Sequence, residues 1–186
     1  IAMVCEGNPR WLISLMNSIH AASGSVDDIA HSVQVDKIRD NAVAFEAMLS
    51  HLARGDSTGV VTNTSINGLL KQIGNYFFDR LEVDEFVEDP PLSFFVDNKI
   101  DKDIQSALRI AINHGAVIHM ADPEEEEYGN DLGSLIGKRF RLAYMLNPLY
   151  KLPLRATRPL SLSTILTKES RVKGESEENL MQPDLF

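Results

Sequence analysis

The 186-residue sequence has a single cysteine, Cys5, and no long hydrophobic run. One cysteine excludes an internal disulfide and suits a protein kept in a reducing compartment. No apolar stretch approaches the roughly 18 residues that a membrane span requires. The first residues also lack the basic and apolar regions of a secretory signal. We therefore expect a cytoplasmic protein with no membrane partner.

Catalytic and metal-binding patterns are missing as well. No Gly-Lys-Ser/Thr loop of the kind that cradles phosphates is present, so the chain alone is not expected to hydrolyse ATP. His20, His31 and His51 are scattered without ligand spacing, and the acidic run Glu124–Glu127 lacks the glycine turn of a calcium loop. Nothing resembles a Ser/His/Asp or Cys/His set. We expect no catalytic residue, metal or cofactor for the chain alone.

Basic residues are outnumbered, 18 against 27 acidic ones, and the net charge is −9. This balance argues against a protein that generally coats nucleic acid. The charges are also unevenly placed. Residues 121–137 include six acidic and no basic residues, whereas residues 138–158 include six basic and no acidic ones. The change of sign at Gly137-Lys138 is the most informative electrostatic feature of the sequence.

Hydrophobic periodicity predicts a mainly helical, α+β fold. Apolar residues recur at helical spacing in four segments, about residues 8–21, 26–32, 36–54 and 65–80. The length allows one domain or two small ones. We expect a small helical bundle over 1–59 and a second domain over 60–166. The polar segment 167–186 buries too little apolar area to offset ordering entropy, so we expect a flexible tail.

The second domain has a recognisable order of elements. Asp101 can cap a helix over about 102–114, and Gly115 can end it. Ala116–Met120 indicates a strand, a loop follows, and Lys138–Tyr144 alternates in polarity as a second strand does. Helix, glycine, strand, loop and strand is the order of a winged helix, in which the β-hairpin is the wing.

The first helix begins at the motif Gly7-Asn8-Pro9-Arg10. Asn8 suits the N-cap, and Pro9 suits the first turn of a helix. Arg10 lies in the first turn, where the helix dipole disfavours a cation by a few tenths of a kcal/mol or more. Either an outside acidic partner holds Arg10, or it is an ordinary solvated or ion-paired surface residue. The residues alone leave both readings open.

The Gly7–Arg10 motif resembles the second sensor motif in the helical lid domain of AAA+ and related P-loop ATPases. In that family the arginine reaches the terminal phosphates of the nucleotide. Arg139–Arg155 resembles the closing segment of prokaryotic ATPases similar to the origin-recognition and helicase-loader group, which carry a winged helix after the lid. The resemblance covers about residues 5–166. It implies the carboxy-terminal part of a larger ATPase, whose upstream core supplies ATP and Mg²⁺.

The residues do not decide whether the winged helix contacts DNA or a protein. Its candidate recognition helix, Asp101–His114, has no net charge and offers Gln105, Arg109 and Asn113 to bases. The acidic loop before the second strand would be repelled by phosphates. Basic side chains after that loop can contact phosphates or a partner, or can pair with the chain's own acids; they are Lys138, Arg139, Arg141, Lys151, Arg155 and Arg158.

The chain ends in Gln182-Pro-Asp-Leu-Phe186, which is similar to the pentapeptide by which many bacterial proteins dock on the replication sliding clamp. In such docking Leu185 and Phe186 would fill an apolar pocket, and Gln182 would form a hydrogen bond at its rim. Pro183 departs from the pattern, because leucine is more usual there. The alternative is that Leu185 and Phe186 pack on this protein's own surface or are unstructured.

Two functional hypotheses remain. In the first, this region is the nucleotide-sensing lid and winged helix of a AAA+-type ATPase that acts on DNA or on a protein partner. In the second, it is a stand-alone winged-helix module that binds a protein or DNA, and Arg10 is structural. A third, narrower idea is an adaptor tethered to the sliding clamp. An upstream Walker-type strand and loop would distinguish the first from the second.

Overall fold

A computed structural model of the chain describes residues 1–23, 29–51, 59–83, 90–120, 133–155 and 157–167. This part of the chain forms six helices and a four-stranded sheet, which confirms the predicted mainly helical, α+β class. The elements in order are α1 Pro9–Ser23, α2 His31–His51, α3 Ile66–Val83, β1 Ser93–Phe95, α4 Lys102–Asn113, β2 Val117–His119, β3 Arg139–Leu142, α5 Asn147–Tyr150, β4 Pro159–Ser161 and α6 Leu162–Thr167.

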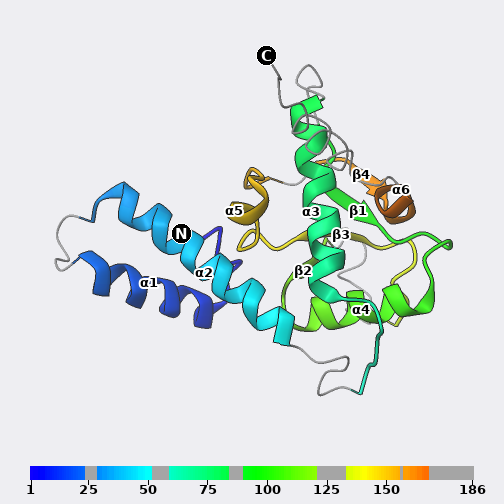
Figure 1. The fold of residues 1–186 in the computed structure, drawn as a ribbon, viewed down its shortest axis with the longest axis horizontal. Coiled ribbons are helices and arrows are strands. Elements are labelled where there is room, and N and C mark those ends of the chain that lie inside the picture. Colours follow the sequence, from blue (N-terminus) through cyan, green and yellow to red (C-terminus); the bar gives the residue numbers. More distant parts are fainter. Residues whose placement is uncertain (24–28, 52–58, 84–89, 121–132, 156, 168–186) are drawn as a thin grey trace, which may run out of the picture.

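Helices α1 and α2 lie side by side as an antiparallel pair at one end of the molecule (Figure 1). Leu15 and Ile19 of α1 are fully buried together with Cys5, as expected for a small buried hydrophobe. Leu12 and Met16, which the periodicity also placed on the inner face, are 39% and 43% exposed. The predicted apolar face was therefore too wide, because α1 is covered by a single neighbouring helix.

Helix α2 joins this pair to the rest of the fold, because it contacts α1, α3 and α5. Its residues Phe45 and Leu49 belong to the same core cluster as Leu70 and Phe77 of α3. The separate short helix predicted over 26–32 is not formed as such, because α2 begins at His31; residues 24–28 lie outside the described part. The division into units 1–59 and 60–166 stays a prediction.

Helix α3 begins where the sequence indicated. The Ser65 Oγ accepts a hydrogen bond from the Gly68 N–H at 3.1 Å, which is an N-cap contact. The predicted apolar residues of this helix face inward: Ile66, Leu69, Leu70, Ile73 and Phe77 are buried. As expected, this helix supplies much of the core, and it contacts α4, α5 and α6.

The sheet has the order β2-β3-β1-β4. Strands β2 and β3 are antiparallel, with Ile118 opposite Arg141, and they form the predicted hairpin. Strand β1 is antiparallel to β3 and parallel to β4, so that Phe94 lies opposite both Phe140 and Leu160. Neither of these two pairings was predicted. The stacked rings of Phe94 and Phe140, 5.9 Å apart, help to bury the centre of the sheet.

Helix α4 precedes the hairpin and has the predicted cap, because the Asp101 carboxylate accepts a hydrogen bond from the Ile104 N–H at 2.8 Å. Periodicity predicts that Ile104, Leu108, Ala111 and Ile112 face inward. Leu108 and Ala111 are fully buried as predicted, and so are Ala107 and Ile110, whereas Ile104 and Ile112 are only partly buried. A single helix lies between β1 and β2. A helix-turn-helix has two helices. In the described part of the chain from β1 to β3, only its second helix, as α4, and the hairpin are represented.

The chain after β3 folds back on the domain. Leu162 and Ile165 of α6 are buried in the main core cluster. Strand β3 ends at Leu142, and Asn147-Pro148 opens α5. The buried Asn147 amide donates to the Pro153 carbonyl at 2.7 Å and holds the following turn in place.

Candidate functional site

The start of α1 carries the Gly7–Arg10 motif in a tightly fixed conformation. Glu6 and Gly7 both have left-handed backbones, with φ values of 53° and 71°, so the chain reverses sharply before the helix. The Asn8 carboxamide oxygen accepts hydrogen bonds from the N–H groups of Arg10 and Trp11, at 3.0 and 3.4 Å. Asn8 is thus the N-cap and Pro9 the first helical residue, as predicted.

Arg10 is exposed. Within the described part of the chain, no hydrogen bond or ion pair of its guanidinium group occurs. The ion-paired alternative therefore finds no intramolecular acid here, and the solvated alternative remains beside that of an outside acidic ligand. The helix dipole makes this a position where an anion is favoured and a lone cation is not.

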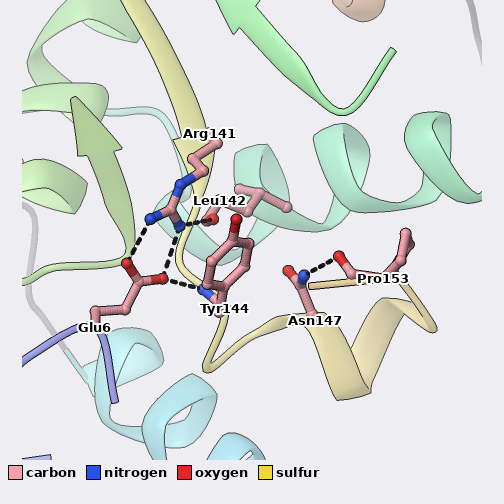
Figure 2. A network of polar contacts seen from close by, with 6 residues as sticks. All are labelled: Glu6, Arg141, Leu142, Tyr144, Asn147 and Pro153. Atoms are coloured by element: carbon pink, nitrogen blue, oxygen red, sulfur yellow. Dashed lines mark hydrogen bonds and ion pairs between the residues drawn. The ribbon is translucent and has the colours of Figure 1, made fainter. Parts of the chain in front are cut away.

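Glu6, four residues before Arg10, is fastened to the sheet. The two guanidinium nitrogens of Arg141 donate to the two Glu6 carboxylate oxygens, at 2.7 and 2.6 Å. The Tyr144 N–H donates to the same carboxylate, and the Arg141 guanidinium lies 3.9 Å from the centre of the Tyr144 ring. Figure 2 shows Glu6 and Arg141 pointing at one another from the N-terminal segment and from β3.

This contact is a buried ion pair with its hydrogen-bonding groups satisfied. The Arg141 and Glu6 side chains are only 15% and 8% exposed. A bidentate arginine–carboxylate pair of this kind fixes orientation as well as charge. Removal of one partner would leave an uncompensated buried charge, which typically costs about 3–5 kcal/mol. The pair therefore holds the chain just before the motif against β3.

A second, apolar contact lies beside it. The Trp11 ring approaches Gly115 so closely that a Cβ atom on this glycine would lie 3.1 Å from the indole. The same ring packs edge-on against Phe45 of α2, with ring centres 5.0 Å apart. Gly115 has a φ of 73° and lies between the end of α4 and the start of β2. The first turn of α1 thus rests on the base of the β2–β3 hairpin.

The six basic residues after the loop do not form one surface. Arg139 donates from Nε to the Ser93 hydroxyl at 3.1 Å and from Nη2 to the Thr157 carbonyl, which ties β3 to β1 and to the segment before β4. Arg141 pairs with Glu6, whereas the acids of the loop and tail, which were alternative partners, lie outside the described residues. Both arginines therefore have structural partners within the chain.

The remaining basic side chains lie at the surface, apart from Lys138, which is half-buried. Lys151 is exposed and lies 5.3 Å from the centre of the Phe78 ring. Arg155 and Arg158 are exposed on either side of the segment that leads into β4. Their contact with DNA or with a partner stays a prediction.

The side chains of α4 that were candidates for reading bases are largely engaged inside the protein. The Gln105 amide donates to the Ile100 carbonyl at 2.9 Å, and the Arg109 guanidinium donates to the Gly133 carbonyl. Only Lys102 and Asn113 of this helix are exposed. Because major-groove recognition needs several free polar side chains on one face, α4 is poorly equipped for it.

An open groove of about 460 Å³ lies at the end of β1, lined among others by Phe95, Asp97, Ile136 and Ser161. Burial opposes ionisation of Asp97, but hydrogen bonds from the Ser161 hydroxyl and from the Ser163 N–H outweigh it and lower the pKa of Asp97. The groove therefore holds a carboxylate that is already engaged by hydrogen bonds, and Lys99 is the one basic residue among the described residues that line it.

Some of the predicted features lie on residues outside the described part of the chain. The peptide motif Gln182, Leu185 and Phe186 and the acidic residues 121–132 are outside the described ranges. Among the described residues, no group of three or more His, Cys, Asp or Glu side chains could hold a metal ion. No described helix has both the length and the apolar character needed to cross a membrane.

The role of Glu6 was missed at the level of sequence. It is a lone acid between Cys5 and Gly7, and nothing in the local pattern links it to an arginine 135 positions later. The charge change after Gly137 left pairing within the chain as one of several alternatives for the basic residues. The identity of the partner depends on how the first turn of α1 meets the hairpin, which periodicity does not show.

Comparison with known proteins places this chain by its sequence. A family model described as ORC-CDC6-like matches residues 1–162. The match begins before the capped motif of α1 and extends to the first residue of α6, so it includes the Glu6–Arg141 pair. No curated protein and no solved structure gives a significant match.

Proposed function

Because this chain belongs to the ORC-CDC6-like family, a AAA+ ATPase-related family, we propose that it is the nucleotide-sensing and partner-binding region of such an ATPase. In this proposal Arg10 contacts the terminal phosphates of a nucleotide held by an ATPase core. Helices α1 and α2 act as the lid, and α4 with the β2–β3 hairpin acts as a winged-helix-like unit. ATP and Mg²⁺ belong to the core, whose Walker-type loop this chain does not contain.

The observation that carries the proposal is the presentation of Arg10. The start of α1 is capped by Asn8 and anchored through Glu6, yet Arg10 itself is exposed. An exposed arginine with a freely moving backbone contributes little specificity to phosphate binding, whereas a pre-ordered one loses less entropy on contact. A bound phosphate would also relieve the unfavourable interaction between the Arg10 charge and the α1 dipole.

The experiment is nucleotide turnover and nucleotide affinity of the full-length protein that carries this region together with its ATPase core. Arg10→Ala should reduce ATP turnover by about tenfold or more, because a charge-assisted phosphate contact contributes roughly 1.5–3 kcal/mol. Arg39→Ala is the matched control, since Arg39 is an exposed arginine on α2. Equal behaviour of the Arg10→Ala variant, the Arg39→Ala variant and the wild type would remove the proposal.

A second function is a partner-binding module that works without nucleotide. It is supported by the hairpin and α4 arrangement, and the internal hydrogen bonds of Gln105 and Arg109 favour a protein partner over DNA. DNA binding would instead draw on the exposed Lys151, Arg155 and Arg158, through contacts with phosphates. Replacing all three with glutamine should then abolish binding and flatten its salt dependence, because released counterions set that slope.

Docking on the sliding clamp is a separate part of the proposal and rests on the resemblance of Gln182–Phe186 alone. Deletion of these five residues tests it directly by titration of purified clamp against the full-length and shortened proteins. Loss of clamp binding only in the shortened protein would support docking. Equal clamp binding, or no clamp binding by either protein, would eliminate it.

A further inference from the structure

We propose that Glu6 and Arg141 are positioning residues that set the orientation of Arg10 and couple it to the base of the β2–β3 hairpin. A partner that shifts the hairpin would then change nucleotide affinity through this pair. The inference rests on the proposed function, because it requires Arg10 to contact nucleotide. It assigns to the ion pair a task beyond holding the fold together.

The first support is the number and quality of contacts that fix Glu6. Both carboxylate oxygens are used, by a bidentate Arg141 and by the Tyr144 N–H. Arg141 in turn is held against the Tyr144 ring and donates to the Leu142 carbonyl at 3.2 Å. At 8% and 15% exposure, the two side chains are shielded from water and salt, so the pair has one well-defined geometry.

The second support is the stiffness of the chain between Glu6 and Arg10. Glu6 and Gly7 are held in left-handed conformations, and the Asn8 N–H donates to the Cys5 carbonyl at 2.7 Å. Pro9 fixes its own φ angle, and the Asn8 side chain caps the helix. A displacement of Glu6 is therefore passed on to the first turn of α1 and is not absorbed on the way.

The third support is that two contacts of α1 meet adjoining positions of the hairpin. Glu6 binds the end of β3, and Trp11 rests on Gly115 at the entry to β2. Residues adjacent to these two positions are hydrogen-bonded to each other, because the Ala143 N–H donates to the Ala116 carbonyl at 3.0 Å. The polar contact of Glu6 and the apolar contact of Trp11 therefore lie on either side of Arg10 in the sequence, and both are made with the base of the hairpin.

This geometry makes a thermodynamic prediction. If a partner moves the hairpin and the hairpin moves Arg10, then partner and nucleotide change each other's affinity by the same factor. Breaking the Glu6–Arg141 pair should therefore make partner binding and nucleotide binding independent of each other. A pair that serves stability alone would lower the melting temperature and leave nucleotide binding by the folded protein as it was.

The test uses the full-length protein with its ATPase core, and measures ATP turnover, the KM for ATP and the melting temperature. Arg141→Gln should raise the KM by about fivefold or more, in the range of allosteric couplings. Arg141→Lys, which keeps the charge but not the bidentate geometry, should fall between Arg141→Gln and the wild type. Combined with Arg10→Ala, Arg141→Gln should add nothing further, because the group that it positions is gone.

The matched control is Arg80→Gln. Arg80 is a half-buried arginine that also packs on a tyrosine, Tyr76 of its own helix α3, with 5.6 Å from the guanidinium carbon to the ring centre. Its loss should lower the melting temperature and leave the KM for ATP unchanged. If Arg141→Gln fails to fold, Glu6→Gln provides the same test, because it keeps the shape of the side chain and one of its two acceptor oxygens.

The outcomes separate this inference from the function on which it rests. If Arg10→Ala has no effect on ATP turnover, both fail together. If Arg10→Ala impairs turnover while Arg141→Gln and Glu6→Gln leave the KM within twofold of wild type, the function stands and the positioning role is overturned. Fully additive effects of Arg10→Ala and Arg141→Gln would overturn it as well.

Discussion

The ring of Tyr150 lies so close to the backbone of Gly74 that a Cβ atom built on this glycine would be 2.4 Å from the Cγ of the ring. Gly74 is in the middle of α3, and Tyr150 is the last residue of α5. Both helices contact α2 as well as each other, so this is where three helices meet. Burial and the nearby Glu46 raise the pKa of Tyr150, so the ring stays neutral.

Gly74→Ala should therefore destabilise the protein, although alanine normally favours a helix. Overpacking of this kind costs typically about 1–3 kcal/mol, which exceeds the 0.5–1 kcal/mol gained from helix propensity. Urea unfolding of the two proteins measures the difference. Gly68→Ala, in the first turn of the same helix, meets Ser65 at 3.3 Å and should change the free energy of unfolding little. Equal behaviour of the two variants would contradict the packing described.

The Asn8 cap can be tested in the same way. Asn8→Ala removes the acceptor for the Arg10 and Trp11 amides and should lower the free energy of unfolding by about 1 kcal/mol. Asn8→Asp keeps an acceptor and adds a negative charge at the positive end of the α1 dipole, so it should be neutral or stabilising. Chemical denaturation followed by circular dichroism distinguishes the two. If the free energy of unfolding fell as much in Asn8→Asp as in Asn8→Ala, Asn8 would not act as a helix cap.

Arg10 should contribute nothing to the stability of the fold. Its side chain is exposed, and its charge lies at the end of the helix where a cation is unfavourable. Arg10→Ala should leave the free energy of unfolding unchanged or raise it by a few tenths of a kcal/mol. Arg39→Ala on α2 is again the control. A loss of more than about 1 kcal/mol in the Arg10 variant would point to a structural partner and weaken the case for a nucleotide contact.

Stability should fall in acid through two carboxylates. A hydrogen bond from the Thr64 hydroxyl, followed by one from the Asn63 N–H at 2.8 Å, lowers the pKa of Asp103. Contacts with Ser161 and Ser163 lower the pKa of Asp97 despite its burial. Because both folded-state pKa values lie below the unfolded value of about 3.9, their stabilisation is present above that pH and is lost as the pH falls below it.

Asp103→Asn should consequently be less stable than the wild type at neutral pH and should lose less stability between about pH 5 and pH 2. Urea midpoints across this range give the slope for each protein. Asp36→Asn, an exposed position on α2, leaves the Thr64 and Asn63 contacts in place and should keep the wild-type slope. An unchanged slope in the Asp103 variant would show that its hydrogen bonds do not favour the ionised carboxylate.

Helices with local start signals could be predicted from the sequence. Asn8, Ser65 and Asp101 each lie directly before a helix and each accepts an amide hydrogen bond from it. The signal and the structure that it predicts are within four residues of one another, so no tertiary information is needed. The hairpin was predicted for a similar reason, because Lys138–Tyr144 alternates in polarity and follows a strand after a helix end at Gly115.

The contacts between distant segments could not be predicted. Strand β4 is three residues long and begins with proline, so no periodicity marks it, and its parallel pairing with β1 spans 66 positions. The Glu6–Arg141 pair spans more than twice that separation. In both cases the partner is chosen by the way whole elements pack, which the local pattern does not contain. The helix start that carries Arg10 could therefore be predicted, whereas its support by the Glu6–Arg141 pair could not, and the role of Arg10 stays a prediction.

The place of β1 in the sheet has a consequence for the order in which the molecule can form during synthesis. Its two neighbours, β3 and β4, both come later in the chain, so a nascent protein that has emerged only as far as α4 holds Ser93–Phe95 with neither partner. The aromatic rings of Phe94 and Phe95 and the open backbone edge are then available to any other chain. A pause in translation between Phe95 and Arg139 should thus favour aggregation, and a pause after Ser161 should not.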